Sequence, residues 1–275
     1  DQIATLAVQS PVVLDLDGDG ELSYSRILFD VNGDGQLDLS AWVAPNDGVL
    51  VHDVNRDGRL NDRGEFVFAR HAGETDLQGL AAQFDSNGDG VFDVRDEQFG
   101  AFGVWQDVNG NGISEQDELR SLADLGISAI QLQSDGVARQ PADGVTEAGR
   151  TVVEMEDGST RVAADASFAY ESGAVKQTAP GVFSLNTQGL TLDLAQLVDQ
   201  PVQTLDLAAE GSQTVRLSLQ DLLAQQSAEP LKILGTEQDA VEIRGEAVQA
   251  TTVDQDGVSY QAFRSEEHTS ELQSQ

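Results

Sequence analysis

Length, composition and charge narrow the classes of protein to which this chain can belong. Its 275 residues suffice for one large or two modest domains, and we expect two. Lys and Arg number 15 against 48 Asp and Glu, which gives a formal net charge of −33. A chain this acidic repels nucleic acid and anionic lipid and attracts cations. Cys is absent, which excludes disulfide bonds and thiolate metal sites.

The apolar residues are organised for a folded protein outside the membrane. They make up 39% of the chain and recur in short blocks bounded by turns, which favours folding over disorder. No block reaches the roughly 18 apolar residues that a transmembrane helix needs, so we predict no membrane insertion. No basic-then-apolar signal stands at the N-terminus. Because the chain begins at Asp1, we expect it to be a fragment of a longer protein.

Strands and helices are both expected in the first part of the chain. Three runs rich in Leu or β-branched residues lead directly into polar loops and predict short strands over 12–16, 27–31 and 49–54. Apolar residues at helical spacing predict three helices over 76–84, 96–106 and 117–126, the last ending at Gly126. This interpretation makes the region from 85 to 126 a loop-helix-loop-helix arrangement.

The pattern changes after Gly126. Alternating runs over 127–133 and 151–163 indicate strands, and Asp157-Gly158 within the second run predicts a hairpin turn. Residues 171–182 have few large apolar side chains and contain Pro180, which is typical of a linker. Further strand runs follow, with one short helix over 218–225 and a final hairpin.

The predicted fold class is therefore α+β. A loop-rich domain with short strands and helices is expected over 1–170. A linker over 171–182 and a mostly β module over 183–263 follow it.

Five polar blocks of the form Asp-x-Asp/Asn-x-Asp/Asn-Gly dominate the first domain. They begin at Asp15, Asp30, Asp53, Asp85 and Asp107, with irregular spacings that exclude a solenoid of equal repeats. Calcium takes about six to eight oxygen ligands, and an EF-hand loop of about twelve residues supplies them from positions one, three, five, seven (a carbonyl), nine and twelve. A lone block of this kind is often only a solvated turn, but five in one chain favour calcium binding.

The fourth and fifth blocks fit this EF-hand-like pattern best. The fifth block fills every oxygen position and departs only at position eight, which is Ser114 instead of an apolar residue; its predicted ligands are Asp107, Asn109, Asn111, Ile113 and Glu118. The fourth block has Asp in place of Glu at position twelve, with Glu97 next to it; its predicted ligands are Asp85, Asn87, Asp89, Val91 and Asp96.

The other three blocks are incomplete at position twelve. In the third block this position is Gly64, and we expect Glu65 to replace it; the predicted ligands are Asp53, Asn55, Asp57, Arg59 through its carbonyl, and Glu65. In the first and second blocks it is Arg26 and Ala41, so these loops need an oxygen from elsewhere. Their predicted ligands are Asp15, Asp17, Asp19, Asp30, Asn32 and Asp34.

The motif order resembles a known family over about residues 11–170. The segments SPVVLDLDGDG, FDVNGDG, VHDVNRDG, FDSNGDGVFD and GVWQDVNGNGISEQDELRSLADLGI are similar to the calcium-binding domain of large RTX-type (hemolysin-type) secreted proteins and adhesins. They resemble in particular the self-processing module of iron-regulated RTX proteins. The resemblance implies type I secretion, a secreted or cell-surface location and Ca²⁺ as the bound ion.

The resemblance also implies a cleavage reaction, which this sequence does not support. In the related module calcium drives cleavage of an Asp-Pro bond just before the first block. The matching dipeptide here is Ser10-Pro11, and no Asp-Pro occurs in the chain. Serine has no β-carboxylate to attack its own carbonyl, so we predict no enzymatic activity. A calcium-triggered autoprotease and a dockerin-like binding module, suggested by the spacing of the last two blocks, remain as alternatives.

The C-terminal part is assigned more loosely. Residues 183–263 resemble a β-rich module of large bacterial adhesins that ends in mid-pattern at Phe263, and residues 264–275 resemble a translated sequencing adapter. The predicted function is a calcium-stabilised structural segment of a secreted or surface RTX-like adhesin. Its expected partners are calcium ions and a cell-surface or matrix ligand of the parent protein, with no nucleic acid. We interpret His52 as a strand residue and both tryptophans as core residues.

Overall fold

The computed structural model describes residues 6–9, 11–31, 34–60, 63–115, 117–197, 200–207, 211–224, 231–244, 248–255 and 258–265. The chain divides into two compact units, Asp1–Ala174 and Val175–Gln275. The boundary falls inside one long strand, β11 (Thr160–Ala179). Among the described residues no helix has the length and apolar content to cross a bilayer.

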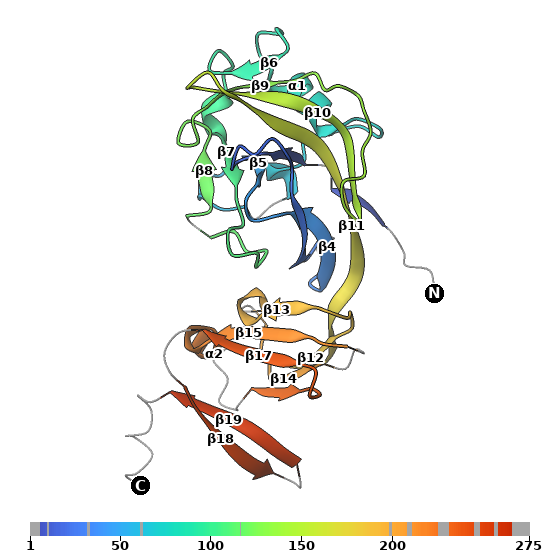
Figure 1. Cartoon of the computed structure of the whole chain (residues 1–275), viewed down its shortest axis with the longest axis vertical. Helices are drawn as coiled ribbons and strands as arrows, with labels where there is room; N and C mark the ends of the chain where they lie inside the picture. Colours follow the sequence, from blue (N-terminus) through green and yellow to red (C-terminus); the bar gives the residue numbers. More distant parts are fainter. Residues whose placement is uncertain are drawn as a thin grey trace. The chain divides into compact units, whose positions relative to one another are not determined.

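The first unit is built on an antiparallel sheet (Figure 1). The strand order is β11-β2-β5-β7-β8, with β2 at Val12–Leu14, β5 at Gly48–His52, β7 at Phe102–Trp105 and β8 at Leu119–Ser121. β3 (Tyr24–Phe29) and β4 (Leu37–Val43) form a hairpin, and β4 also pairs with β11. The first, second, third and fifth polar blocks follow β2, β3, β5 and β7, whereas the fourth lies outside these strands.

A second group of strands extends from β11. β10 (Val145–Met155) pairs with β11 and with β9 (Ile127–Gln131), β9 pairs with β6 (Val91–Asp93), and β1 (Leu6–Gln9) pairs with β11. The predicted hairpin is confirmed, because Glu154 pairs with Thr160 and the Gly158 amide donates to the Met155 carbonyl at 3.0 Å. The three predicted strands of residues 12–54 are confirmed as well.

The central strands are buried on both faces. Alternate residues of β2, β5 and β7 enter two separate clusters, as the two-residue period of a strand requires. One cluster packs against helix α1 (Asp76–Phe84), and the other contains residues of β3 and β4. Trp42 and Trp105 are both in the second cluster, 2% and 1% exposed, which confirms them as core residues.

The predicted α+β class is wrong, because the chain is mostly β, with 42% strand and 10% helix. The helix over 76–84 is confirmed as α1, which begins with a capping box between Thr75 and Gln78. The helices predicted over 96–106 and 117–126 are replaced by a short 3₁₀ turn, η2 (Phe99–Ala101), and by β7 and β8.

The error at 96–106 has a physical cause. All four residues of β7 are buried, so its apolar run loses the alternation that marks a half-buried strand. Gly103, which would weaken a helix, permits close strand pairing, since a β-carbon there would lie 2.6 Å from the Arg120 carbonyl oxygen.

The second unit has a different architecture (Figure 1). β12 (Val182–Leu185), β14 (Thr204–Asp206) and β16 (Lys232–Leu234) pair in parallel, and so do β13 (Thr191–Asp193), β15 (Thr214–Ser218) and β17 (Ala240–Arg244). Each successive coil of chain thus adds one strand to each of two ladders, as in a solenoid. The other elements are η3 (Leu194–Leu197), α2 (Leu219–Ala224) and the hairpin β18 (Val248–Gln255) with β19 (Val258–Ser265).

Residues 171–182 do not form the linker that we predicted. They contain the end of β11, a turn and the first residue of β12, and Val175, paired with Leu185, is 1% exposed. Small and polar side chains are sufficient for this strand segment because the backbone pairing of β11 with β12 holds it in place. Of the adapter-like segment 264–275, residues 266–275 lie outside the described part of the chain.

Candidate metal-binding loops

All five polar loops share one backbone geometry. In each, the amide of the glycine at position six donates to the carboxylate of the first aspartate, and that glycine has a φ between 70° and 87°. The five bonds are Gly20–Asp15 at 3.0 Å, Gly35–Asp30 at 2.9 Å, Gly58–Asp53 at 3.0 Å, Gly90–Asp85 at 3.0 Å and Gly112–Asp107 at 2.9 Å. Because a positive φ favours glycine, the shape of the turn explains why glycine recurs at position six of the sequence pattern.

The side chain at position five is fixed in the same way in every loop. Its oxygen accepts the amide two residues later, at 2.8 Å for Asp19, 2.9 Å for Asp34, 2.9 Å for Asp57, 3.0 Å for Asp89 and 2.8 Å for Asn111. In the first loop, oxygens of Asp15, Asp17 and Asp19 all lie within 4.8 Å of one another. The first loop therefore gathers carboxylate oxygens around its turn, as a cation site requires.

The fifth loop has the most buried set of predicted ligands. Asp107 is 3% exposed, Asn111 9% and Glu118 4%. Glu118 accepts the Trp105 indole N–H at 3.2 Å, the Val108 amide at 3.1 Å and the Glu115 amide at 3.3 Å. Burial raises the pKa of both Asp107 and Glu118, and the negative charge of Glu115 adds to each effect. A bound cation would relieve this penalty.

The fourth loop closes in the same manner with an aspartate. Asp96, 4% exposed, accepts the amides of Ser86 at 2.8 Å and Asp93 at 3.0 Å, which are positions two and nine of the loop. These are the positions that contact Glu118 in the fifth loop. Arg95 forms ion pairs with Asp89 at 2.7 Å and Asp93 at 2.6 Å, but its side chain is 59% exposed, so these pairs contribute little.

The first loop obtains its acid from another part of the chain. Asp47, between β4 and β5, is fully buried and accepts the amides of Leu16 at 3.1 Å and Ser23 at 2.8 Å. These amides are again positions two and nine. Burial raises the pKa of Asp47 to about 6, and the charges of Asp15 and Asp17 act in the same direction.

Sequence reasoning missed Asp47 because it lies 31 residues from Leu16. The signal that could have found it is the turn Pro45-Asn46-Asp47-Gly48, which places an acid directly before a buried strand. Arg26, at position twelve of the first loop, instead pairs with Glu171 at 2.6 Å.

The turn that carries Asp47 contacts two loops. The Asn46 side-chain amide donates to Asp17 of the first loop at 2.9 Å. The Gln106 side-chain amide, beside the fifth loop, donates to the Pro45 carbonyl at 2.9 Å. The first and fifth loops, far apart in sequence, are thus held by one short segment.

The third and fifth loops are joined at their eighth positions. The Leu60 amide donates to the Ser114 hydroxyl at 2.8 Å, which explains why a serine can stand at position eight of the fifth loop. Glu65, the predicted replacement acid, is 4% exposed at the end of η1 (Arg63–Glu65). Arg56 takes the place of the glycine found at position four in the other loops and has a φ of 58°.

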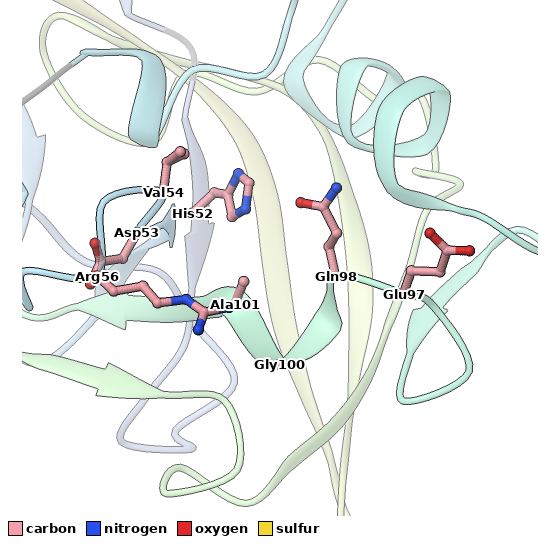
Figure 2. A pocket seen from close by; sticks show the side chains of 8 residues that line it. All are labelled: His52, Asp53, Val54, Arg56, Glu97, Gln98, Gly100 and Ala101. Atoms are coloured by element: carbon pink, nitrogen blue, oxygen red, sulfur yellow. The ribbon is translucent and has the colours of Figure 1, made fainter.

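A pocket of about 480 Å³ borders the third loop. Figure 2 shows His52, Asp53 and Arg56 on one side of it and Gln98 on the other. The His52 ring stacks on Phe102 with 4.6 Å between centroids, and burial lowers its pKa. The Asp53 Oδ1 atom is buried and has no hydrogen-bond partner among the described residues. His52 is thus a strand residue packed on the core, as predicted.

In the second loop, the predicted ligand Asn32 lies outside the described residues, together with Gly33. Asp30 and Asp34 adopt the common geometry. The position-nine residue, Asp38, is fully buried in β4 and was not predicted as a ligand.

Buried carboxylates for which the structure shows no ion pair among the described residues occur in four of the five loops or their closing turns. Apart from Glu65 of the third loop, six buried acids belong to the loops or their closing turns, namely Asp15, Asp38, Asp47, Asp96, Asp107 and Glu118. In the part of the chain that the structure describes, none of the six forms an ion pair with a basic side chain. Buried negative charges need compensation, so this set of oxygen donors fits a hard divalent cation.

Comparisons with known proteins agree on the first unit. The family model described as the SPM domain matches residues 12–169, which contain all five loops. The iron-regulated protein FrpA of Neisseria meningitidis serogroup C is 32% identical over 168 residues, covering 56% of this chain and 15% of that protein. The chain therefore spans only about 15% of the length of this relative. The predicted relationship to iron-regulated proteins is confirmed at the level of the family.

Proposed function

The chain belongs to the SPM domain family, and on that premise we propose that it is a calcium-binding, calcium-stabilised structural segment of a larger RTX-like adhesin. The observation that carries the proposal is the set of six buried loop carboxylates without basic partners among the described residues. Carboxylates, amide oxygens and carbonyls are the ligands that calcium prefers. Neither Cys nor His is among the predicted ligands, which disfavours zinc and copper.

The bound ions would act as a folding switch. Without them, clustered carboxylates repel one another and lose their hydration on folding. An ion that binds only the folded state stabilises it by about 2.7 kcal/mol when its concentration is 100 times the Kd. Low cytosolic calcium would keep the segment loose for export, and external calcium near the millimolar range would fold it. We therefore propose a secreted or cell-surface location, with a surface or matrix ligand bound elsewhere in the parent protein.

We propose no catalytic role for this segment. The self-processing reaction implied by the family resemblance needs an aspartate before Pro11, where this chain has Ser10. Ser10 lies outside the described residues, so this argument rests on its chemistry and not on its placement.

Circular dichroism and calorimetry on the full chain test the proposal. Near-ultraviolet spectra are recorded in EGTA, after addition of calcium and after addition of magnesium at the same concentration. We expect the aromatic signal of the first unit to appear with calcium and to be much weaker with magnesium, and we expect titration calorimetry to detect several bound ions. Identical spectra in EGTA and in calcium, without binding heat, would contradict the proposal.

A further inference from the structure

The fourth loop contains the dipeptide Asn87-Gly88 at an exposed turn. The nitrogen of a residue that follows asparagine can attack the side-chain carbonyl carbon, and glycine hinders this attack least because it has no β-carbon. Gly88 has a φ of 73°. Apart from its neighbours in the chain, no heavy atom of the described residues lies within 4 Å of the point where a β-carbon of Gly88 would stand. The attack is therefore sterically open at this turn.

Hydrogen bonds of the loop hold both groups that would react. The Gly88 amide donates to Asp85 Oδ1 at 2.8 Å, so a carboxylate stands ready to accept the proton of the attacking nitrogen. The Asn87 Oδ1 atom accepts the Asp89 amide at 2.8 Å, so negative charge that develops on this oxygen would be stabilised. A proton acceptor at the nucleophile and a donor at the developing oxyanion are the two groups that promote acyl transfer.

The fifth loop contains two dipeptides of the same type, and each lacks one part of this arrangement. Asn109 is exposed and its Oδ1 accepts the Asn111 amide at 2.9 Å, but the Gly110 amide donates to the backbone carbonyl of Asp107 at 3.3 Å. The Gly112 amide donates to the Asp107 carboxylate at 2.9 Å, but Asn111 is only 9% exposed. Of these three dipeptides, only that of the fourth loop combines the carboxylate, the oxyanion donor and access to water.

We propose that Asn87 is a modification site at which the fourth loop promotes its own deamidation. The Gly88 nitrogen forms a bond with the side-chain carbonyl carbon of Asn87, and its proton passes to Asp85. The bond between that carbon and the side-chain nitrogen breaks, and the nitrogen takes up the proton and leaves as ammonia. Water then adds to either carbonyl carbon of the cyclic imide and breaks its bond to the Gly88 nitrogen, which yields aspartate or isoaspartate at position 87.

Either product changes the fourth loop. Both add a negative charge at position three, which is neutral in the unmodified chain. Isoaspartate also lengthens the backbone by one carbon and displaces the amides that Asp85 accepts from Gly88 and Gly90. The inference concerns a covalent change within the loop, so it goes beyond the proposed calcium binding and does not depend on it.

Peptide mapping by mass spectrometry of the aged full chain tests this site. One sample is incubated at neutral pH in calcium chloride and another in concentrated urea, and the peptides that contain Asn87 and Asn109 are compared. In the folded chain we expect Asn87 to deamidate at least about tenfold faster than Asn109, since a positioned proton acceptor contributes about 100-fold or more in enzymes. In urea, where the loop geometry is lost, we expect similar rates. Equal rates in the folded chain, or a preference for Asn87 that persists in urea, would overturn the inference.

A pair of variants tests the role of the carboxylate. Asp85→Asn keeps the size of the side chain but removes the proton acceptor, and we expect its Asn87 rate to fall to that of Asn109. Asp143→Asn removes the same charge from an exposed turn of the same unit and should leave the rate unchanged. Near-ultraviolet circular dichroism shows whether each variant is folded, and the wild-type comparison needs no variant. An unchanged Asn87 rate in folded Asp85→Asn would show that Asp85 takes no part.

Discussion

The two units of this chain handle their acidic residues in different ways. The first unit has a formal charge of 10 − 33 = −23, and the second 5 − 15 = −10. The two units differ more in the number of carboxylates that they bury than in their net charge. Among the described residues the first unit buries ten carboxylates, whereas the second buries one, Asp193, which pairs with Arg244 at 3.3 Å.

The comparison shows two ways to stabilise an acidic chain. In the second unit, Arg216 forms an ion pair with Glu242 at 2.8 Å across the parallel ladder, and the buried Asp193 has a basic partner in Arg244. In the first unit the buried loop acids accept hydrogen bonds from backbone amides, and on the proposed function their charge would be compensated by a cation from solution. On the proposed function, the stability of the first unit would depend on the ions in the medium, whereas that of the second would not.

Chelation should separate the two units most strongly. Both tryptophans, Trp42 and Trp105, are buried in the first unit, so their fluorescence reports on that unit alone. In EGTA we expect red-shifted emission and a lower unfolding temperature for this signal, because each lost ion removes about 2.7 kcal/mol at 100 times its Kd. Strand signal from the second unit should persist in far-ultraviolet circular dichroism. Simultaneous loss of both signals would break the comparison.

Removing the charge of one predicted ligand in the first unit should lower the free energy of unfolding when calcium is present but not when it is absent. Glu118→Gln keeps the size of the side chain but removes a buried charge. With calcium present we expect a loss of about 2–3 kcal/mol in the free energy of unfolding, the worth of one ion. In EGTA we expect no loss or a small gain, because burial disfavours the charged form of Glu118.

Urea unfolding followed by tryptophan fluorescence, in calcium and in EGTA, measures both values. Glu156→Gln, at an exposed position in the same unit, is the matched control and should change neither. An equal loss in both media would show that Glu118 acts only through its hydrogen bonds.

A buried acid outside the loops should respond to pH instead. Asp165 is 2% exposed and accepts the amides of Asp76 at 2.8 Å and Leu77 at 3.2 Å at the start of α1. Burial raises its pKa above the ordinary value. The folded state then binds the proton more tightly than the unfolded state, so its contribution is greatest at low pH and falls as pH rises through the folded pKa.

Asp165→Asn should remove this dependence. We expect wild type to gain stability over the variant as pH falls from 7 toward 4, by roughly 1.4 kcal/mol for each unit of raised pKa. Unfolding curves at saturating calcium measure the difference. A difference that grows with pH would mean that the carboxylate is stabilised in its charged form by the amides of α1.

The smallest effect is expected in the second unit. Arg216→Gln breaks an ion pair whose side chains are 32% and 52% exposed. Such surface pairs contribute less than about 1 kcal/mol. Urea unfolding followed by far-ultraviolet circular dichroism should show the same small loss in calcium and in EGTA. A loss that depends on calcium would show that the second unit also relies on ions.

The loops were accessible to sequence reasoning because their cause is local. Each turn needs a glycine at position six and a short oxygen-bearing side chain two residues from the amide that it accepts, and both needs appear as sequence spacing. Helix α1 was predictable for the same reason, since its cap and its apolar residues lie within one segment.

The residues that sequence reasoning missed depend on tertiary pairing. Asp47 reaches the first loop only because β2 pairs with β5, with Val13 opposite Val49. The strand β7 was predicted as helix because both of its faces are covered, which no local pattern records. The parallel ladders of the second unit were likewise not apparent from the strand runs alone.

If the loops bind ions as proposed, the long-range position of Asp47 implies that the first loop would be completed later than the fifth. The fifth loop contains its own closing acid, Glu118, so its proposed ligands would come together as soon as a short stretch of chain turns. The first loop must first close a segment of 31 residues, at an entropic cost that grows with the length of the segment. Local contacts form before distant ones in most folding reactions. An ion held by the first loop would therefore stabilise only chains whose central sheet has already formed, and it would act late in folding.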